Sequence, residues 1–355
     1  MKPSSPRYVF VDALRGIASL GVLLAHIINN EISKKTLQAL LPRSIQEICF
    51  NGQFGVEVFF VLSGFVIALS LSQKPLTFPR AVNFALRRQI RLDPPYFAAL
   101  LALMGLHAAF GRGFPDLKTL ALNFVYAHNL AGVPQILGVA WTLCLEIQFY
   151  LAFLAILSLD RVLGKPRDAP FSMLAVHFLW ISGVASCVLV QISTPWQLYA
   201  FAPGSWFYFA AGVLSFWCWK GLAPQWVFGT IVLGMMGSAF VAFLREASYV
   251  SASFQGIEAG LTTALLLFVG GARGWLETVS LGRGVQFLGR ISYSLYLTHA
   301  FVIEALMWTT RALWGEKNGA MSGFALSVPL ALAVAQGFYW LIERPSVNWA
   351  ARFKN

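Results

Sequence analysis

The long apolar runs of this chain leave few folds open to it. Runs of roughly 18 residues or more, with hardly a charge inside them, recur along the sequence, and about 20 apolar residues make a helix that crosses the hydrocarbon of a bilayer. Inside lipid, a helix satisfies all of its own backbone polar groups. Charged residues make up 12% of the chain, against about 25% in soluble domains. The sequence therefore predicts an all-α, polytopic membrane protein.

Ten runs are long enough to span a membrane, which predicts a bundle of about ten transmembrane helices. The shortest lies at 94–111, and the partly apolar piece Leu117–Gly132 after it suits an interfacial or re-entrant segment. No linker or internal repeat divides the chain, so we expect one integral domain over 1–355 and no fused soluble domain. The runs lie near 10–30, 52–72, 94–111, 136–159, 171–192, 199–219, 225–244, 253–271, 287–310 and 320–342.

Loop charges predict the orientation of the bundle. If the N-terminus is cytoplasmic, 17 Lys and Arg lie on the cytoplasmic side and 8 on the other. This excess follows the positive-inside rule, so we expect both termini in the cytoplasm. The net charge of +11 would suit a nucleic-acid partner, but the basic residues lie beside apolar runs. Topology and an anionic ligand explain the charge better, and no nucleic acid is expected.

Three titratable residues, Asp12, Arg15 and His26, interrupt the first apolar run, VFVDALRGIASLGVLLAHIINN. Arg15 and His26 are eleven residues apart, which is three helical turns with about 20° to spare, so they share a face about 16 Å apart. Asp12, at i−3, is within reach of Arg15. Titratable groups along one membrane-spanning face indicate a polar cavity within the bundle. The alternative for His26 is a structural histidine bonded to a neighbouring carbonyl.

The loop after the second run carries the densest positive charge. Arg87, Arg88 and Arg91 lie within five positions, on what we expect to be a short amphipathic helix that ends before Pro94–Pro95. Guanidinium forks match phosphate oxygens better than lysine does. The cluster therefore indicates anion binding, with a plain topology signal as the alternative.

Carboxylates lie in two further runs. Glu57 precedes Ser63 in GVEVFFVLSGF, where small residues also allow plain helix packing. Glu146 lies within WTLCLEIQFY between Trp141 and Tyr150. A carboxylate there needs a proton or a partner from another helix. The partners we expect are His26, Arg15 or an arginine of the cluster at 87–91.

Other reactive side chains carry weaker signals. His299 lies in the polar run LGRISYSLYLTH of the ninth apolar segment, whereas His177 stands alone on an apolar face and suits a structural role. The four cysteines show no paired spacing, and we assign them no chemistry. We expect no metal.

These motifs, in this order, resemble the membrane-bound acyltransferase-3 family. The resemblance covers roughly residues 8 to 345. It rests on Arg15-x10-His26 after Asp12, GVEVFFVLSGF, Arg87-Arg88-x-x-Arg91, WTLCLEIQFY, LGRISYSLYLTH and the late Glu-Arg-Pro. The sequence departs from the usual pattern at Glu57, where aspartate is common, and at Thr142 and Cys144, where serines are common.

The resemblance implies transfer of an acyl group, usually acetyl from acetyl-CoA or another acyl-CoA, to a hydroxyl of the acceptor. The implied acceptors are surface polysaccharides, lipopolysaccharide and other carbohydrate or lipid-linked glycan molecules, giving O-acetylation. Membrane lipid surrounds such a protein, and its expected place is the bacterial cytoplasmic (inner) membrane.

The residues suggest how that transfer would proceed. His26 suits a general base because its ordinary pKa is near 6.5. Glu146 would orient that imidazole, and Asp12 completes the catalytic group. Arg15 and the cluster Arg87, Arg88 and Arg91 would bind CoA phosphates. Direct attack and an acyl-His26 intermediate both stay open. The other polar candidates, for substrate or structure, are Glu57, Ser63, Trp141, Tyr150 and His299.

Two other classes compete with the enzyme. A proton-coupled secondary transporter would use the same buried titratable residues, but it predicts inverted repeats, which the sequence lacks. A non-catalytic component of a polysaccharide export complex would use the polar residues only for helix packing. Hydrolysis or exchange of acetyl-CoA by the purified protein separates the enzyme from both.

Overall fold

The computed structural model describes residues 8–111, 113–164, 169–194, 197, 200, 202–247 and 252–353. Those residues form helices and connecting turns, with no strand among them, which confirms the predicted all-helical class. Internal contacts divide the chain into two compact units. Unit 1 comprises the chain up to Arg15, Val56–Ala81 and Thr142–Gln286, and unit 2 comprises Gly16–Gly55, Val82–Trp141 and the chain from Phe287.

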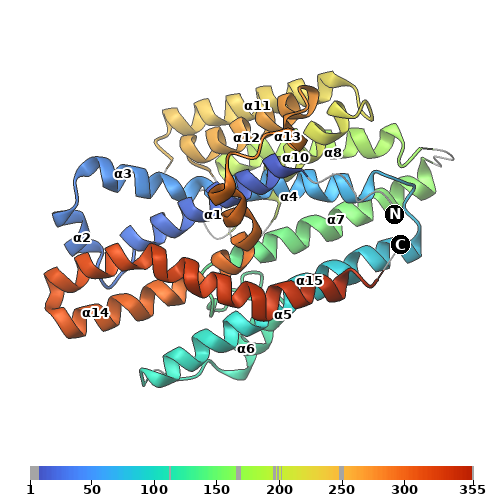
Figure 1. Ribbon diagram of the computed structural model, residues 1–355. Helices are drawn as coiled ribbons and strands as arrows, with labels where there is room; N and C mark the ends of the chain where they lie inside the picture. Colours follow the sequence, from blue (N-terminus) through green and yellow to red (C-terminus); the bar gives the residue numbers. More distant parts are fainter. Residues whose placement is uncertain are drawn as a thin grey trace. The chain divides into compact units, whose positions relative to one another are not determined.

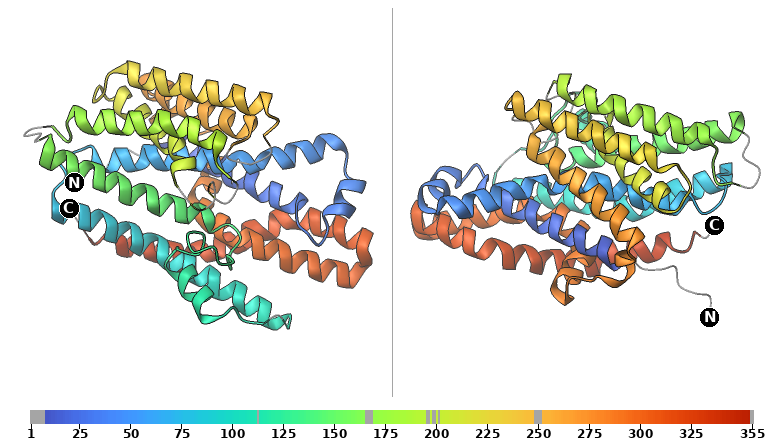
Figure 2. Two further views of the ribbon diagram at one scale, coloured as in Figure 1. Left: turned by 180° about the vertical axis from the view of Figure 1, so that it is seen from behind. Right: turned by 90° about the horizontal axis from the view of Figure 1, so that it is seen from above.

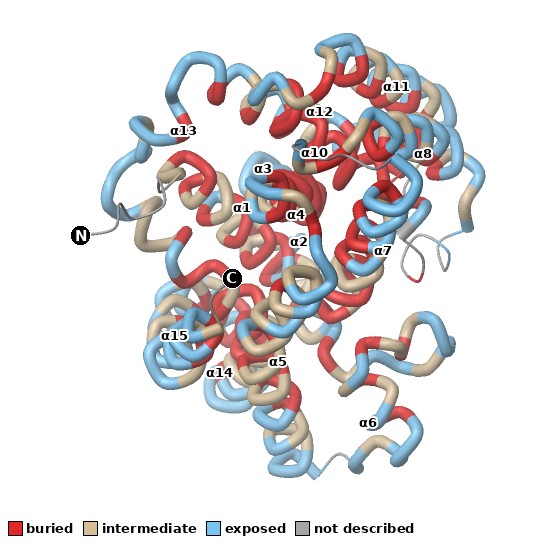
Figure 3. The backbone as a smooth tube through the Cα atoms, turned by 90° about the vertical axis from the view of Figure 1, so that its right-hand side faces the viewer, coloured by how far each residue is buried: buried red, intermediate tan, exposed pale blue. Residues whose placement is uncertain are grey.

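Unit 1 is built around a short and almost wholly buried helix, α10 (Trp206–Trp219). It packs against α8, α11 and α12, and Figure 3 shows it largely coloured as buried while its neighbours turn exposed faces outward. Its run of aromatic residues supplies that core, which explains why the sequence there is apolar on every side. The unit's other helices are α4 (Gly55–Leu71), α7 (Trp141–Leu163), α8 (Met173–Ile192), α11 (Gln225–Leu244), α12 (Phe254–Ala272), α13 (Trp275–Thr278) and the 3-10 turn η2 (Ala202–Gly204).

Two glycines let α4 and α10 cross in backbone contact. A Cβ at Gly64 would lie 2.1 Å from the carbonyl oxygen of Phe209, and one at Gly212 would lie 2.0 Å from that of Val61. Small residues allow this approach between membrane helices. Gly64, the glycine of the LSGF sequence, is therefore a packing residue, as the helix-packing alternative predicts.

Unit 2 has its core between α1 (Val9–Ile28) and α14 (Arg283–Phe338). Leu23 and Ile27 of α1 pack with Leu295 and Ile303 of α14, all fully or nearly fully buried. The first residues of α1 belong to unit 1 and the rest to unit 2. The unit's other elements are α2 (Lys34–Leu40), α3 (Arg43–Asn51), η1 (Gly52–Phe54), α5 (Phe78–Ala109), α6 (Leu117–Phe124), the π-helical turn η4 (Tyr339–Glu343) and α15 (Arg344–Ala350).

Helix α14 is two helices joined at Gly315. This glycine has φ 75° and ψ −178°, a conformation that only glycine adopts readily. Past it the chain reverses, and the two halves run side by side (Figures 1 and 2). Gly323 approaches Met307 across the hairpin, as the glycine's close contacts show. The predicted runs 287–310 and 320–342 are therefore its two arms.

The expected helix end before Pro94–Pro95 is wrong. Helix α5 runs without interruption from Phe78 to Ala109 and contains both prolines. The predicted run 94–111 is its C-terminal part. Beside the prolines, the Tyr126 hydroxyl donates to the Asp93 carboxylate and the Tyr293 hydroxyl donates to the Leu92 carbonyl. Membrane helices tolerate proline in their interior, where a helix in water would end.

Seven helical stretches of the described chain are long and apolar enough to span a membrane, which supports an integral membrane protein. The broken helix α14 counts once among them, and α10 is apolar but shorter. The expected run 199–219 begins outside the described residues. The count of ten spans and the cytoplasmic termini stay predictions. The seven stretches are Val9–Ile28, Arg43–Leu71, Trp141–Leu163, Met173–Ile192, Gln225–Leu244, Phe254–Ala272 and Arg283–Ala350.

The piece predicted as interfacial or re-entrant forms a short helix and a tied loop in unit 2. Asp116 caps α6 by accepting from the backbone of Thr119, and these hydrogen bonds hold the pKa of its carboxyl below the usual value. The Asn123 side chain bonds to Pro134 and Ile136 and so closes the loop. Burial lowers the pKa of His128 in that loop to about 4.

Candidate active site

Helix α1 carries the two residues of the first motif as predicted. It is unbroken from Val9 to Ile28, so the helical rise separates Arg15 from His26 by about 16 Å on one face. The half-buried guanidinium of Arg15 forms no hydrogen bond or ion pair with any residue that the structure describes. The pairing with Asp12 that the spacing allows is therefore not made, and Arg15 is available to an anion.

The tautomer of His26 is fixed by its own helix. Its Nδ1 lies 2.9 Å from the carbonyl oxygen of Val22, and because a carbonyl can only accept, Nδ1 carries the proton. The Nε2 lone pair then faces away as an acceptor. His26 is exposed while its neighbours Ala25 and Ile27 are buried. The ring is thus bonded to a carbonyl, as the structural alternative expects, and is also accessible as a base must be.

A second histidine lies against His26 in unit 2. The rings of His26 and His299 meet edge to face, with centroids 4.8 Å apart and planes at 76°. The Nδ1 of His299 is 3.0 Å from the Leu295 carbonyl, so it also carries the proton there. Its Nε2 is buried and has no hydrogen-bond partner among the described residues. His299, on the run LGRISYSLYLTH, is therefore a direct neighbour of the candidate base.

Further contacts bring other motif residues together in unit 2. The backbone N–H of Ser294 donates to a carboxylate oxygen of Glu343 at 3.0 Å. This bond joins the ninth apolar run to the late Glu-Arg-Pro, and Arg344 of that motif lies over the Trp340 ring at 4.1 Å. Tyr293, one residue before Ser294, donates to Leu92 of α5 beside the arginine cluster.

The arginine cluster lies on α5 in unit 2. At 100° per residue Arg87, Arg88 and Arg91 fall within an arc of about 100°, so they share one face of the helix. Arg91 is exposed, and Arg87 and Arg88 are half-buried. The Nε–H of Arg87 donates to the Asn83 carbonyl at 3.3 Å. Three guanidinium groups on one face suit a polyanionic ligand.

In unit 1 the structure pairs Glu146 with Ser63. The Ser63 hydroxyl donates to a Glu146 carboxylate oxygen at 2.6 Å, joining α4 to α7. Both residues are half-buried. Tyr150, one turn further along α7, is buried, and Trp141 begins that helix and is half-buried. The sequence identifies Ser63 and Glu146 separately. The partners that it predicts for Glu146 are basic residues.

Glu57 occupies the most costly position of the candidate residues. It is fully buried in α4, and neither carboxylate oxygen has a hydrogen-bond partner among the described residues. An unpaired buried carboxylate costs several kcal/mol unless it is neutralised or bonded. The sequence predicts Glu57 near a membrane boundary, with a cation or water beside it.

His177 and the four cysteines, to which the sequence assigns no chemistry, have surroundings that suit a structural role. The Nδ1 of His177 bonds to the Met173 carbonyl at 2.7 Å, within its own helix α8. All four cysteines are buried and free. The structure thus groups the candidates by unit. Unit 1 holds Asp12, Arg15, Glu57, Ser63, Glu146 and Tyr150, and unit 2 holds His26, Arg87, Arg88, Arg91, Trp141 and His299.

Comparison with known proteins supplies the family. Over 310 residues, 83% of this chain and 89% of the relative, the chain is 27% identical to the "Exopolysaccharide production protein ExoZ" of Rhizobium meliloti (strain 1021). It is 25% identical over 330 residues, 90% of this chain and 89% of the relative, to the "Putative acetyltransferase ORF330" of Acidianus two-tailed virus. No solved structure matches it. The sequence profile of a family described as an acyltransferase domain matches residues 8–340. The chain therefore belongs to the acyltransferase-3 family of membrane acyltransferases.

Proposed function

We propose that this membrane acyltransferase moves an acetyl group from acetyl-CoA to a hydroxyl of a cell-surface carbohydrate. The observation that carries the proposal is the pair on α1, where Arg15 and accessible His26 stand about 16 Å apart on one helical face and no described residue pairs with Arg15. That separation is comparable with the length of a pantetheine arm. A phosphate at Arg15 and a thioester at His26 therefore fit one extended donor.

The names of two relatives support the proposed acceptor and the proposed acyl group. The name of ExoZ refers to exopolysaccharide production, and that of ORF330 refers to acetyl transfer. A polysaccharide or its lipid-linked precursor is therefore the acceptor that we propose, and acetyl is the group transferred. We propose the bacterial cytoplasmic membrane as the location, since acetyl-CoA is cytosolic and the glycan is exported.

The arginines would bind the acetyl-CoA donor. A CoA molecule carries several phosphate charges, and guanidinium groups bind phosphate oxygens in pairs. Arg15 forms no hydrogen bond or ion pair with any described residue, and Arg87, Arg88 and Arg91 share one face of α5. We propose that Arg15 binds CoA phosphate in unit 1 and, as a separate proposal, that the cluster at 87–91 binds CoA phosphate in unit 2. The binding would then weaken as salt rises.

His26 would carry out the proton transfers. Its Nε2 lone pair accepts the proton of the acceptor hydroxyl while that oxygen bonds to the thioester carbonyl carbon. The carbon–sulfur bond breaks, and the leaving CoA sulfur takes the proton back from His26. No net proton or electron is gained. The Val22 carbonyl holds Nδ1–H throughout, so Nε2 is the atom presented to the hydroxyl.

The decisive experiment compares a variant of His26 with a matched control variant of His177. His26→Ala abolishes acetyl transfer to glycan and release of CoA, measured on protein purified in detergent. His177→Ala keeps both, because His177 makes the same bond to its own helix but lies in α8 of unit 1. Near-normal transfer by His26→Ala, in protein that elutes as a single folded species, would overturn the mechanism.

A second measurement separates the arginine cluster from a topology signal. Changing Arg88 and Arg91 together to Gln weakens acetyl-CoA binding and reduces its salt dependence. Arg43→Gln, which removes an exposed charge paired with Glu47, leaves the affinity unchanged. If the double variant binds acetyl-CoA as the unchanged protein does, the cluster serves topology alone. Release of CoA by the purified protein also excludes the transporter and the non-catalytic assembly partner.

A further inference from the structure

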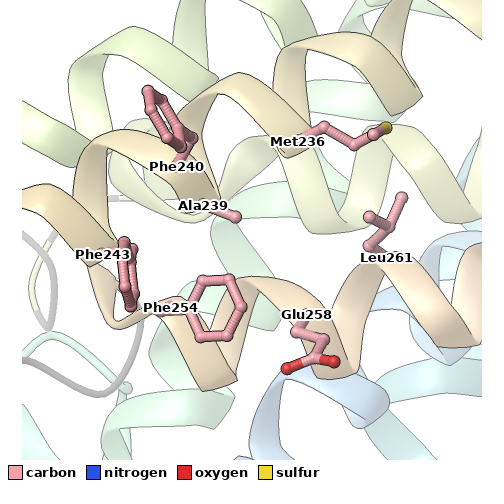
Figure 4. Close-up of a pocket in the computed structure, with 7 residues that line it drawn as sticks. All are labelled: Met236, Ala239, Phe240, Phe243, Phe254, Glu258 and Leu261. Atoms are coloured by element: carbon pink, nitrogen blue, oxygen red, sulfur yellow. The ribbon is translucent and has the colours of Figure 1, made fainter.

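An apolar groove lies between α11 and α12 of unit 1, apart from every residue of the proposed chemistry. Its volume is about 450 Å³. Six apolar side chains and one carboxylate line it, drawn in Figure 4. They are Met236, Ala239, Phe240, Phe243, Phe254, Leu261 and Glu258.

The groove is shaped for an apolar chain. Phe243 and Phe254 meet with ring centroids 5.7 Å apart, and Met236 and Leu261 lie at its other end in Figure 4. Met236 and Phe240 are 52% and 61% exposed, although both helices are apolar enough to span a membrane. In a bilayer such a surface contacts lipid tails.

Glu258 makes this groove different from an ordinary lipid-facing surface. It is exposed, and it forms no hydrogen bond or ion pair with any residue in the described part of the chain. It lies one turn into α12, about 6 Å along the axis from Phe254. Helix α12 has 19 residues, about the length that hydrocarbon requires. When α12 spans the hydrocarbon, a carboxylate at this position lies just inside the apolar layer, where a cationic partner stabilises it.

We propose that this groove binds an aminophospholipid, phosphatidylethanolamine, with an acyl chain along Met236, Phe240 and Leu261 and the ammonium group at Glu258. The ammonium brings a positive charge and three N–H donors to an acceptor-only carboxylate. An anionic headgroup such as phosphatidylglycerol is repelled there. A choline headgroup has no N–H, and so it loses the hydrogen bonds.

Native mass spectrometry of the full chain tests the site directly. The protein is released from detergent micelles doped with phosphatidylethanolamine, phosphatidylglycerol or phosphatidylcholine of matched acyl chains. Retained phosphatidylethanolamine exceeds each of the other two at least about tenfold, the size expected for one charged hydrogen-bonded contact. Lipid mass is read without any acyl transfer, so the outcome is independent of the proposed reaction.

Three variants define the result. Glu258→Gln removes the preference while apolar chain binding persists, and Leu261→Trp, which fills the groove, removes bound phosphatidylethanolamine. Glu277→Gln, an exposed carboxylate of α13 in the same unit, leaves the preference intact. Equal retention of the three lipids, a preference kept by Glu258→Gln, or a dimer that forms through the groove and excludes lipid would each overturn the proposal.

Discussion

Glu57 combines complete burial with a carboxylate that no described residue bonds. Replacing a buried charge by an apolar side chain of similar size is often stabilising. Glu57→Met should therefore raise the free energy of unfolding by about 1–3 kcal/mol. Thermal unfolding in detergent, followed by intrinsic fluorescence, measures the shift. Loss of acetyl transfer in this more stable variant would show that the carboxylate is retained for substrate.

The matched control is Glu47, an exposed carboxylate whose oxygen lies 3.0 Å from the Arg43 Nε. Exposed ion pairs contribute little, so Glu47→Met should change the unfolding free energy by less than about 0.5 kcal/mol. Should Glu57→Met unfold at a lower temperature than the unchanged protein, the carboxylate would have to be stabilised by bound water or ligand.

The ring of His299 packs on that of His26, with ring centroids 4.8 Å apart, and should hold it in place. A base displaced by about 1 Å can lose two orders of magnitude in rate. We expect His299→Ala to lower kcat roughly 10- to 100-fold, with the KM for acetyl-CoA unchanged. His299→Phe, which retains an aromatic ring, should recover most of the loss. If Phe and Ala are equally impaired, the Nε2 atom rather than the ring is what His26 requires.

Contacts within one helix can be predicted from the sequence, whereas contacts between distant segments cannot. Helical spacing within one element correctly placed Arg15 and His26 on a common face. The partners of Glu146 and His26 come from segments 83 and 273 positions away, so no local period could find them. A hydroxyl partner for Glu146 was missed because a carboxylate in an apolar run first suggests a cation.

In helix α5, the low helix propensity of proline predicts an end that the structure does not have. Two adjacent prolines predict a helix end in water, yet the helix continues through Pro94 and Pro95. The hydropathy pattern begins an apolar run at the same place, so it predicts the basic loop and that run as separate elements. Two tyrosines distant in sequence bond beside the prolines, since Tyr293 donates to the Leu92 backbone carbonyl and Tyr126 donates to the Asp93 carboxylate.

The hairpin in α14 rests on a single backbone conformation. Gly315, at φ 75° and ψ −178°, occupies a region that costs other residues about 1–3 kcal/mol. Gly315→Ala should therefore lower stability by that amount, measured as the apparent unfolding temperature. Gly105→Ala, inside α5 with no atom within 4 Å of the new Cβ, should be neutral or stabilising. Equal loss in both variants would mean that the turn tolerates a side chain.

Over the whole molecule, hydropathy correctly predicted an all-helical chain that can span a membrane, but not how every helix lies. The fourteen-residue helix α10 is apolar because unit 1 buries it on all sides. Composition cannot tell such a core helix from a full span. The loop charges add independent information, since they depend on the side of the membrane rather than on packing.

Those charges make a prediction that bears on the reaction, because acetyl-CoA is available only in the cytosol. The arginine cluster at 87–91 must then lie on the same side as Lys74 and Arg352, with Lys35 on the other side. All three are exposed, and the four native cysteines are buried, so single introduced cysteines report cleanly. A membrane-impermeant maleimide on intact cells should label Lys35→Cys alone, and permeabilised cells should label Lys74→Cys and Arg352→Cys as well.

Labelling of Arg352→Cys in intact cells would require an odd number of spans. Labelling of Lys74→Cys there would place the arginine cluster outside, away from cytosolic acetyl-CoA, and would leave that cluster without its proposed ligand.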